Sequence, residues 1–336
     1  MVSPDFSKQT LDILARRARF QCSNPDCGVH TTGPNSDPEK ATTIGEAAHI
    51  FGAKPGSMRF DAAMSDVTRS SITNGIWLCR NCHGHIDRDE ANFPAILLFA
   101  WRKEHEERML LELGTRGERI RHEVEKASLH FLAGYPQIIQ RIVADRPVGW
   151  EWRLAAELLR HLTTPQIKRF NNLVAGHYYR AYPRVKSEDF TGWLSERTHV
   201  MSKLTGPLVH LYQRLTESFG KPGEPGDAEE INDVCKLISE MIGEMINHEE
   251  VLRFTLIPDE GGELRTLLID AIGGNLKTLV ELPEALDGAV ALIGTDHGGT
   301  VEEPRIVKWK ATFELPEDFV SRFEEAVQRF GQAVGT

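Results

Sequence analysis

Four of the five cysteines form two close pairs, a spacing typical of a metal site. Four residues separate Cys22 from Cys27, and two residues separate Cys79 from Cys82. Each pair can present two thiolates on one turn of the backbone, and two such turns complete the tetrahedral set of four sulfurs that Zn²⁺ prefers in structural sites. We therefore predict a structural zinc ion on these four cysteines. Free structural cysteines or disulfides are the alternatives.

Two other residues, His30 and Cys235, are of types that can bind zinc. His30 is close enough in sequence to the first pair to replace one thiolate, although four cysteines are sufficient. Cys235 lies in the run INDVCKLISEMI, whose apolar residues have helical spacing. We predict Cys235 to be a small buried core residue rather than a ligand.

Polar residues occur in a fixed order between and after the cysteine pairs. His49 follows a short apolar run, Asn74 precedes the run GIWLC, and His83 directly follows Cys82. This order, the CxxCH ending and the spacing within NGIWLC resemble the HNH endonucleases. The resemblance implies a ββα-metal, treble-clef-like fold. It covers residues 15 to 105 and is especially similar to the nuclease domain of bacterial antiphage HNH-SAVED (CBASS) effectors, which pair a nuclease with a cyclic-oligonucleotide sensor.

The resemblance implies hydrolysis of phosphodiester bonds, and the residue types suit that chemistry. Hydrolysis needs a base that activates water and a cation that stabilises charge on the phosphate in the transition state. His49, with a side-chain pKa near neutrality, suits the base, and His83 suits a ligand of the cation. By the same resemblance, Asn74 bonds to the backbone and fixes the loop that presents His49. The predicted catalytic residues are therefore His49, Asn74 and His83.

The rest of the cation site is less regular. Asp87 lies four residues after His83, on the same face of a helix, and by resemblance to HNH enzymes it is the second ligand of Mg²⁺ or a similar divalent cation. Many HNH motifs carry a ligand immediately before the base, but this chain has Ala48 there. Strand alternation places Glu46 on the side of Ala48, so Glu46 is the candidate for the missing ligand.

The charge pattern places a polyanionic substrate at the N-terminal part. The formal net charge is −10, but residues 1 to 110 hold 13 Lys+Arg against 14 Asp+Glu, whereas the rest of the chain carries the acidic excess. We expect double-stranded DNA to meet this part of the chain. The candidate contacts to nucleic acid are Lys54, Arg59, Arg69 and Arg80.

The elements that must position these residues can be read from periodicity and turn signals. We expect a helix over 6–20, strands over 43–50 and 74–79, a helix over 81–92, and another helix from 93 with Pro94 in its first turn. A small, turn-rich fold of this kind has little core and needs the zinc as a staple.

The whole chain is expected to be a multidomain α+β protein. Residues 1–113 form the HNH nuclease domain with its structural zinc, 114–225 a helical domain, and 226–336 an α+β regulatory or interaction domain. In the last, a helix over 229–247 precedes strand-like runs at 251–257, 264–272, 276–282, 289–295 and 305–315, and a helix closes the chain over 316–331. The Pro/Gly-rich stretch 220–230 predicts a linker. Residues beyond the resemblance match no family signature.

The functional expectation is a metal-dependent HNH DNA endonuclease of an antiphage defence system. Its C-terminal region would regulate it, with a cyclic oligonucleotide or a protein as the activator and homo-oligomerisation as a further expectation. The chain shows no membrane span and no signal peptide, so we expect a cytoplasmic protein without a membrane partner. The alternative is a zinc-dependent module that binds nucleic acid or a partner without cleaving.

Overall fold

A computed structural model describes residues 5–113, 130–221, 223–292, 315 and 318–334. Helices dominate these residues, and two small antiparallel sheets, each of two strands, accompany them. The chain divides into two compact units, the first holding the described residues of 1–154 and 290–296 and the second those of 155–289 and 297–336. No helix among the described residues is long and apolar enough to cross a membrane.

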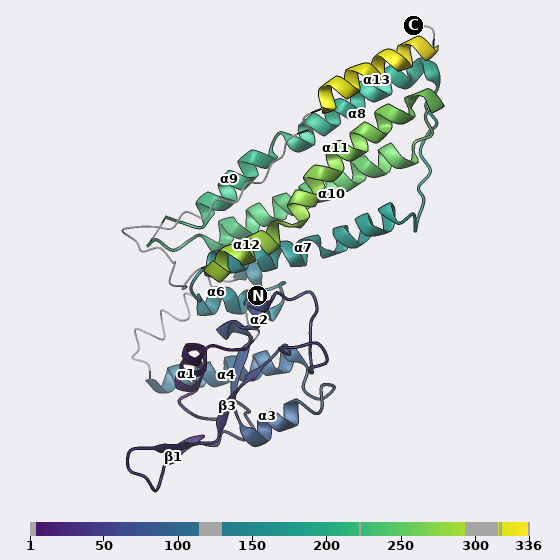
Figure 1. The fold of residues 1–336 in the computed structure, drawn as a ribbon. Helices are drawn as coiled ribbons and strands as arrows, with labels where there is room; N and C mark the ends of the chain where they lie inside the picture. Colours follow the sequence, from purple (N-terminus) through teal and green to yellow (C-terminus); the bar gives the residue numbers. More distant parts are fainter. Residues whose placement is uncertain (1–4, 114–129, 222, 293–314, 316–317, 335–336) are drawn as a thin grey trace. The chain divides into compact units, whose positions relative to one another are not determined.

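The first unit contains both sheets (Figure 1). Its helices and strands are α1 (Lys8–Arg17), β1 (Thr32–Pro34), β2 (Ala41–Thr43), β3 (Gly45–His49), α2 (Asp66–Arg69), the 3₁₀ turn η1 (Ile72–Asn74), β4 (Gly75–Cys79), α3 (Arg80–Ile86), α4 (Ala95–Leu113), η2 (His130–Leu132) and α6 (Gln137–Asp145). Helix α7 (Trp150–Val174) begins in this unit and continues into the second.

Strands β3 and β4 pair antiparallel and lead into α3, so the region has the order strand, strand, helix. In the register, Gly45 lies opposite Cys79 and His49 lies opposite Gly75. All five residues of β4 are buried, because the hairpin is covered on both faces. On one face Trp77 packs in a cluster with Leu14 and Ala15 of α1 and with Ala18, the C-cap of that helix. The hairpin is thereby held between helices, which fixes the ends of both strands.

The predicted elements of this region agree closely with the structure. The strands predicted at 43–50 and 74–79 are β3 and β4, and the leading helix is α1, which Ser7 caps by accepting from the Thr10 backbone N–H. Helix α4 begins at Ala95, so Pro94 directly precedes the helix instead of lying in its first turn. The helix predicted at 81–92 is shorter, because α3 ends at Ile86 with Asp87 as its C-cap. The periodic pattern therefore located these elements but misplaced several of their boundaries.

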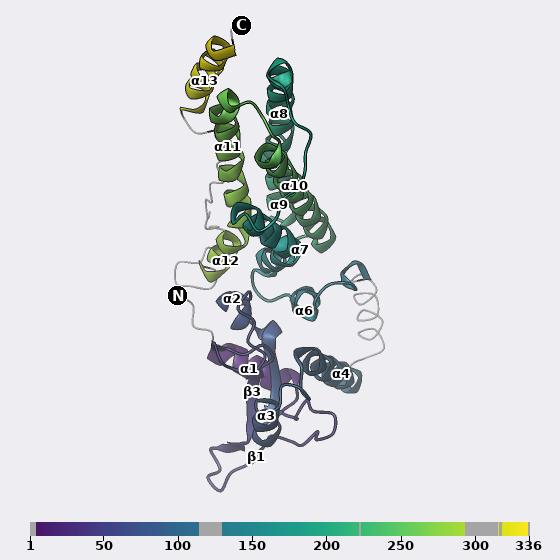
Figure 2. The same ribbon diagram turned by 90° about the vertical axis from the view of Figure 1, so that its right-hand side faces the viewer.

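The second unit is helical throughout its regular structure. Its elements after α7 are η3 (Ser187–Asp189), α8 (Phe190–Thr205), α9 (Leu208–Ser218), α10 (Ala228–Phe254), η4 (Asp259–Gly261), α11 (Gly262–Val280), α12 (Leu282–Leu292) and α13 (Phe319–Val334). Helix α10 packs against α8, α9 and α11 (Figure 2). Its buried residues accordingly lie on more than one face of the helix.

The predicted α+β architecture of residues 226–336 is wrong for the residues that the structure describes. The strand-like runs at 264–272 and 276–282 lie mostly in α11, and those at 251–257 and 289–295 begin within α10 and α12. Leu264, Leu267, Leu268 and Ala271 are buried together on α11, a spacing of three to four residues that fits a helix. Short apolar runs do not distinguish strand from buried helix. The run 305–315 lies outside the described residues except for its last residue.

Other predictions for the C-terminal part agree with the structure. The helices predicted at 229–247 and 316–331 are α10 and α13. The predicted linker at 220–230 lies between α9 and α10 as far as residue 227, and its last three residues belong to α10. Asp227 begins α10 by accepting from the backbone N–H groups of Glu229 and Glu230. The division into three domains stays a prediction.

Candidate functional site

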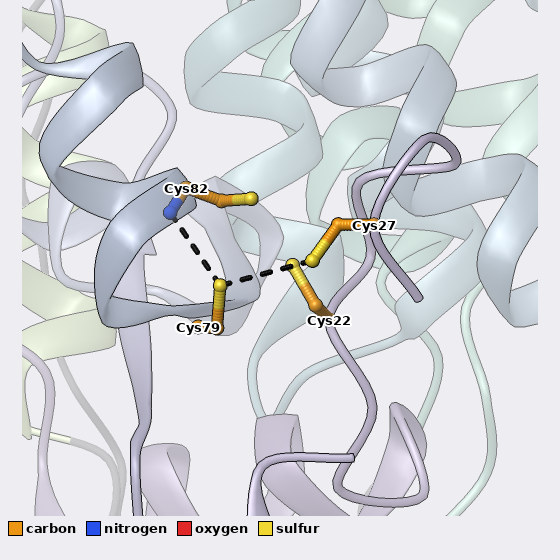
Figure 3. A group of neighbouring side chains, drawn as sticks. All are labelled: Cys22, Cys27, Cys79 and Cys82. Carbon is orange, nitrogen blue, oxygen red and sulfur yellow. Dashed lines mark hydrogen bonds between the residues drawn. The ribbon is translucent and has the colours of Figure 1, made fainter. Parts of the chain in front are cut away.

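The four paired cysteines converge on one point (Figure 3). Their sulfur atoms all lie within 4.8 Å of one another, and the Sγ atoms of Cys27 and Cys79 are 3.9 Å apart. A disulfide requires about 2.05 Å between sulfurs. In a tetrahedral zinc site with Zn–S bonds of about 2.3 Å, neighbouring sulfurs are about 3.8 Å apart. The cluster therefore has the composition and dimensions of a site for a metal ion such as zinc.

Two backbone turns bring the sulfurs together. In the first turn the Cys22 and Cys27 N–H groups donate to carbonyls of Val29 and Asn24, and Gly28 adopts a left-handed φ of 56°. In the second turn Cys79 caps α3, and its sulfur accepts from the Cys82 backbone N–H. Donors aimed at sulfur are the surroundings that a thiolate requires. Both turns are thus built to present thiolates inward.

Burial raises the pKa of two of these thiols. Desolvation raises the pKa of the Cys22 thiol strongly and raises the pKa of Cys82 to about 11. Both groups would therefore be neutral at pH 7 in the absence of a cation. A bound cation reverses this preference, because metal ligation requires the deprotonated form. Metal binding at the cluster should consequently release protons.

His83 lies between two carboxylates. Its Nδ1 is 2.8 Å from Oε2 of Glu46 on β3, and its Nε2 is 3.3 Å from Oδ2 of Asp87. Glu46 also accepts from Arg80, and Asp87 accepts from Arg59. The structure brings together all three residues predicted for the cation site. However, Glu46 and Asp87 contact opposite ring nitrogens, so as they lie the three residues do not converge on one point.

The carboxylates favour a charged imidazole. The hydrogen bond to Asp87 is the main cause that raises the pKa of His83, burial opposes it, and the bond to Glu46 adds to it. The pKa of Glu46 is lowered, chiefly by its bond to His83. Burial acts to raise the pKa of Asp87, but the bonds from His83 and Arg59 hold it below its usual value. When His83 is neutral, the negative charges of Glu46 and Asp87 are matched by the positive charges of Arg80 and Arg59, which donate to them.

His49 is the last residue of β3, and Asn74 directly precedes β4. The His49 ring is half-buried and stacks on Phe6, with ring centroids 3.8 Å apart and planes 5° apart. Asn74 is fully buried, and its amide exchanges hydrogen bonds with both backbone groups of Phe51 while also donating to the Arg69 carbonyl. The segment directly after His49 is thus fixed to η1 through Asn74.

The four predicted nucleic-acid contacts fall into two classes. Lys54 and Arg80 are exposed. Arg59 and Arg69 are buried, and their guanidinium groups donate to backbone carbonyls. The expectation that these two arginines lie at the surface is wrong, because loop carbonyls need donors once they are removed from water. In this structure Arg59 and Arg69 hold the protein backbone rather than facing solvent.

Sequence reasoning missed the residues that support this region from a distance. Arg102 of α4 is buried and donates to the carbonyls of Ile72 and Gly75, which flank Asn74. Arg102 also pairs with Asp145 of α6, whose side chain is 1% exposed. No local pattern marks these residues, because the partners are separated by 27 to 43 positions in the sequence.

No protein-family model and no curated protein matches this chain.

Proposed function

We propose that the first unit is a metal-dependent DNA endonuclease of the HNH type. The observation that supports this most is the placement of His83 against Asp87 beside the β3–β4 hairpin that also presents His49, in a ββα region joined by four cysteines. An imidazole and a carboxylate in contact, with a further carboxylate nearby, suit a divalent cation such as Mg²⁺. When bound, such a cation would stabilise the charge that develops on the phosphate oxygens.

The two ring nitrogens of His83 suggest different roles for the two carboxylates. We assign Nε2 of His83 and the carboxylate of Asp87 as the groups that would hold the cation. We assign Glu46 to the Nδ1 side, where its oxygen lies 2.8 Å away and would keep the proton on Nδ1. Histidine ligands of metals usually donate their other N–H to a carboxylate in this way. Glu46 would then orient His83 without being a ligand.

His49 is assigned as the general base. A neutral imidazole can accept a proton from the attacking water. The stack on Phe6 restricts the plane of the His49 ring, and Asn74 restricts the backbone that follows it. Both contacts would keep the base in one orientation, which is how a positioned group contributes to catalysis. The zinc would stay structural, since four cysteines leave no open coordination position.

The proposed substrate is double-stranded DNA, with Lys54 and Arg80 as the exposed candidates for phosphate contact. We further propose that the remainder of the chain regulates the nuclease, with a cyclic oligonucleotide or a protein as the activator in an antiphage system. That part of the proposal depends on the resemblance of residues 15 to 105 alone.

One observation favours a second candidate function, a module that binds nucleic acid or a partner without cleaving. Ala48, at the position of a first-strand ligand, is fully buried opposite Ile76 and offers no metal ligand. With Glu46 on the far nitrogen of His83, only two protein ligands remain for the cation. Magnesium often binds through one or two protein ligands and water, so two protein ligands are compatible with cleavage.

Cleavage of supercoiled plasmid by the full-length, zinc-loaded protein tests the proposal. Reactions contain Mg²⁺ or Mn²⁺, with or without EDTA, and are repeated with cyclic oligonucleotides. The variants are His49→Ala and His83→Ala, and the control is His85→Ala, because His85 is exposed on the same helix and lies against Phe93 instead of the carboxylates. We expect cation-dependent cleavage that falls at least about 100-fold in the first two variants and little in the control.

Two results would decide against this assignment. Equal cleavage by a folded His49→Ala variant would remove His49 as the base. Tight binding of duplex DNA without cleavage under any of these cations and activators would favour the non-cleaving module.

A further inference from the structure

Arg59 joins three segments of the first unit through one buried guanidinium group. Its side chain is 2% exposed. Nε donates to the Ile50 carbonyl at 2.8 Å, Nη1 donates to the Ile86 carbonyl at 2.7 Å, and Nη2 donates to Oδ1 of Asp87 at 3.0 Å. Ile50 directly follows β3, and Ile86 is the last residue of α3. One side chain therefore ties the exit of the His49 strand to the end of the helix that carries His83.

The backbone of Arg59 has a conformation that residues with a side chain rarely adopt. Its φ of 58° lies in the left-handed region, which is unfavourable by about 1 kcal/mol or more for a residue with a Cβ. Such conformations persist only where the surroundings determine them, and they cluster at functional sites. At Arg59, the hydrogen bonds of the guanidinium group hold the backbone in this conformation.

We propose that Arg59 is a positioning residue that fixes the carboxylate of Asp87 for cation binding. This inference rests on the proposed function. Because Arg59 occupies Oδ1 of Asp87, the other oxygen is left facing Nε2 of His83. The planar guanidinium is held by the carbonyls of Ile50 and Ile86, so it fixes the rotation of Asp87 rather than following it.

The sparse ligand set explains why such positioning matters. With Ala48 in place of a first-strand ligand, the site offers few protein ligands, and each must be oriented in advance. The carboxylates that ligate metals are themselves hydrogen-bonded, and loss of those partners typically lowers metal affinity by about 10- to 100-fold. Asp87 is 49% exposed at its side chain, so without Arg59 it would rotate into solvent.

Arg69, the last residue of α2, is a matched control in the same connection between β3 and β4. It is as buried as Arg59 and donates to the carbonyls of Gly52, Asp61 and Met64, and its guanidinium lies 4.3 Å from the Phe60 ring centroid. Its carboxylate contact is with Asp66, which takes no part in the proposed site. Substitution of Arg69 therefore reports the effect of weakening the loop without disturbing Asp87.

The test measures Mn²⁺ binding to the full-length, zinc-loaded protein by electron paramagnetic resonance, alongside plasmid cleavage. The variants are Arg59→Met, Arg59→Lys and Arg69→Met, each with and without Asp87→Asn. We expect Arg59→Met to weaken Mn²⁺ binding by about 10- to 100-fold, with Arg59→Lys between it and the wild type. In the Asp87→Asn background, Arg59→Met should weaken binding no further, since its effect passes through Asp87. Arg69→Met should lower the unfolding midpoint and leave Mn²⁺ affinity within about twofold.

The possible failures are distinguishable. If Arg59→Met binds Mn²⁺ like the wild type, or weakens binding as much in the Asp87→Asn background, the inference is wrong while the proposed function stands. If the wild type itself binds no Mn²⁺ beyond the cysteine cluster, the proposed function is overturned and this inference with it. Should Arg59→Met fail to fold, Arg59→Lys decides: affinity equal to that of the wild type would overturn the inference.

Discussion

Asn74 and Phe51 are joined by two hydrogen bonds, in which the Phe51 N–H donates to Asn74 Oδ1 at 2.8 Å and the Asn74 amide donates to the Phe51 carbonyl at 2.9 Å. The side chain of Asn74 thereby extends the contact between the two strand segments to Phe51, two residues beyond the end of β3. Phe51 lies two positions after His49, so this pairing determines how the chain leaves the strand that ends at His49.

Replacement of Asn74 should destabilise the first unit. Asn74→Ala removes the partners of both Phe51 backbone groups and of the Arg69 carbonyl, each of which is at least partly buried. We expect a loss of about 2 to 4 kcal/mol in the free energy of unfolding. Hydrogen exchange of the Phe51 amide and urea unfolding measure it. Asn81→Ala, at an exposed position on α3, should change stability by less than about 0.5 kcal/mol. A similar effect in the two variants would contradict the proposed role of Asn74.

The cysteine cluster should hold one metal ion per chain. Replacement of Cys22, Cys27, Cys79 or Cys82 by serine should abolish stoichiometric zinc, as measured by elemental analysis, and should remove amide protection from β4 and α3. Cys235→Ala is the control, because Cys235 is buried in the second unit near the Ala155 carbonyl. Retention of zinc by the Cys79→Ser protein, or loss of zinc from the Cys235→Ala protein, would show that the ligands are misassigned.

The buried ion pair of Arg102 with Asp145 should be important for stability. The two side chains are 2% and 1% exposed, and Asp145 also accepts from Arg17 and Arg141. Asp145→Ala would leave Glu106 to balance the three guanidinium groups of Arg17, Arg102 and Arg141, and loss of one partner from a buried ion pair typically costs about 3 to 5 kcal/mol. Thermal unfolding of the zinc-loaded protein measures the loss. The exposed pair of Asp12 with Arg16 on α1 provides the contrast, and Asp12→Ala should change stability by less than about 1 kcal/mol.

Acid should weaken the second unit through His248 on α10. Burial, assisted by the charge of Arg197, lowers the pKa of His248 to about 4. The unfolded chain, with an imidazole pKa of 6.5, therefore binds more protons than the folded one between pH 6.5 and pH 4. The contribution of His248 to stability is thus fully present above pH 6.5 and is lost as the pH falls towards 4.

Comparison of variants separates His248 from its neighbours. Glu249, whose pKa is raised by burial, acts in the opposite direction. Hydrogen exchange of α10 between pH 7 and pH 4.5, corrected for intrinsic rates, should show a pH dependence that is smaller in His248→Gln than in the wild type. His199→Gln, at an exposed position on α8, should leave the dependence unchanged. An identical pH dependence in wild type and His248→Gln would refute the assignment.

Local sequence patterns were sufficient for the cysteine cluster and the elements around it. Each of these signals lies within a few residues of sequence, where spacing and backbone preference determine the local geometry. They are the two cysteine pairs, the buried run of β4 and the proline before α4. The same patterns failed at 264–272 and 276–282. A short apolar run can form either a buried strand or a buried helix. The packing of neighbouring helices against α11 determines that these runs are helical.

Only the tertiary structure decided which polar groups meet. From the sequence, Arg59 and Arg69 were expected to contact nucleic acid, but both are buried. Their guanidinium groups donate to backbone carbonyls, and the carbonyl of Ile86 lies 27 positions from Arg59 in the sequence. Glu46 and Asp87 were both expected beside His83, but the β3–β4 register and the end of α3 place them on opposite nitrogens of its ring. The sequence alone determined which residue types are available for a metal. The contacts between distant segments determined their orientation, because burial and hydrogen bonding depend on neighbours that local spacing does not specify.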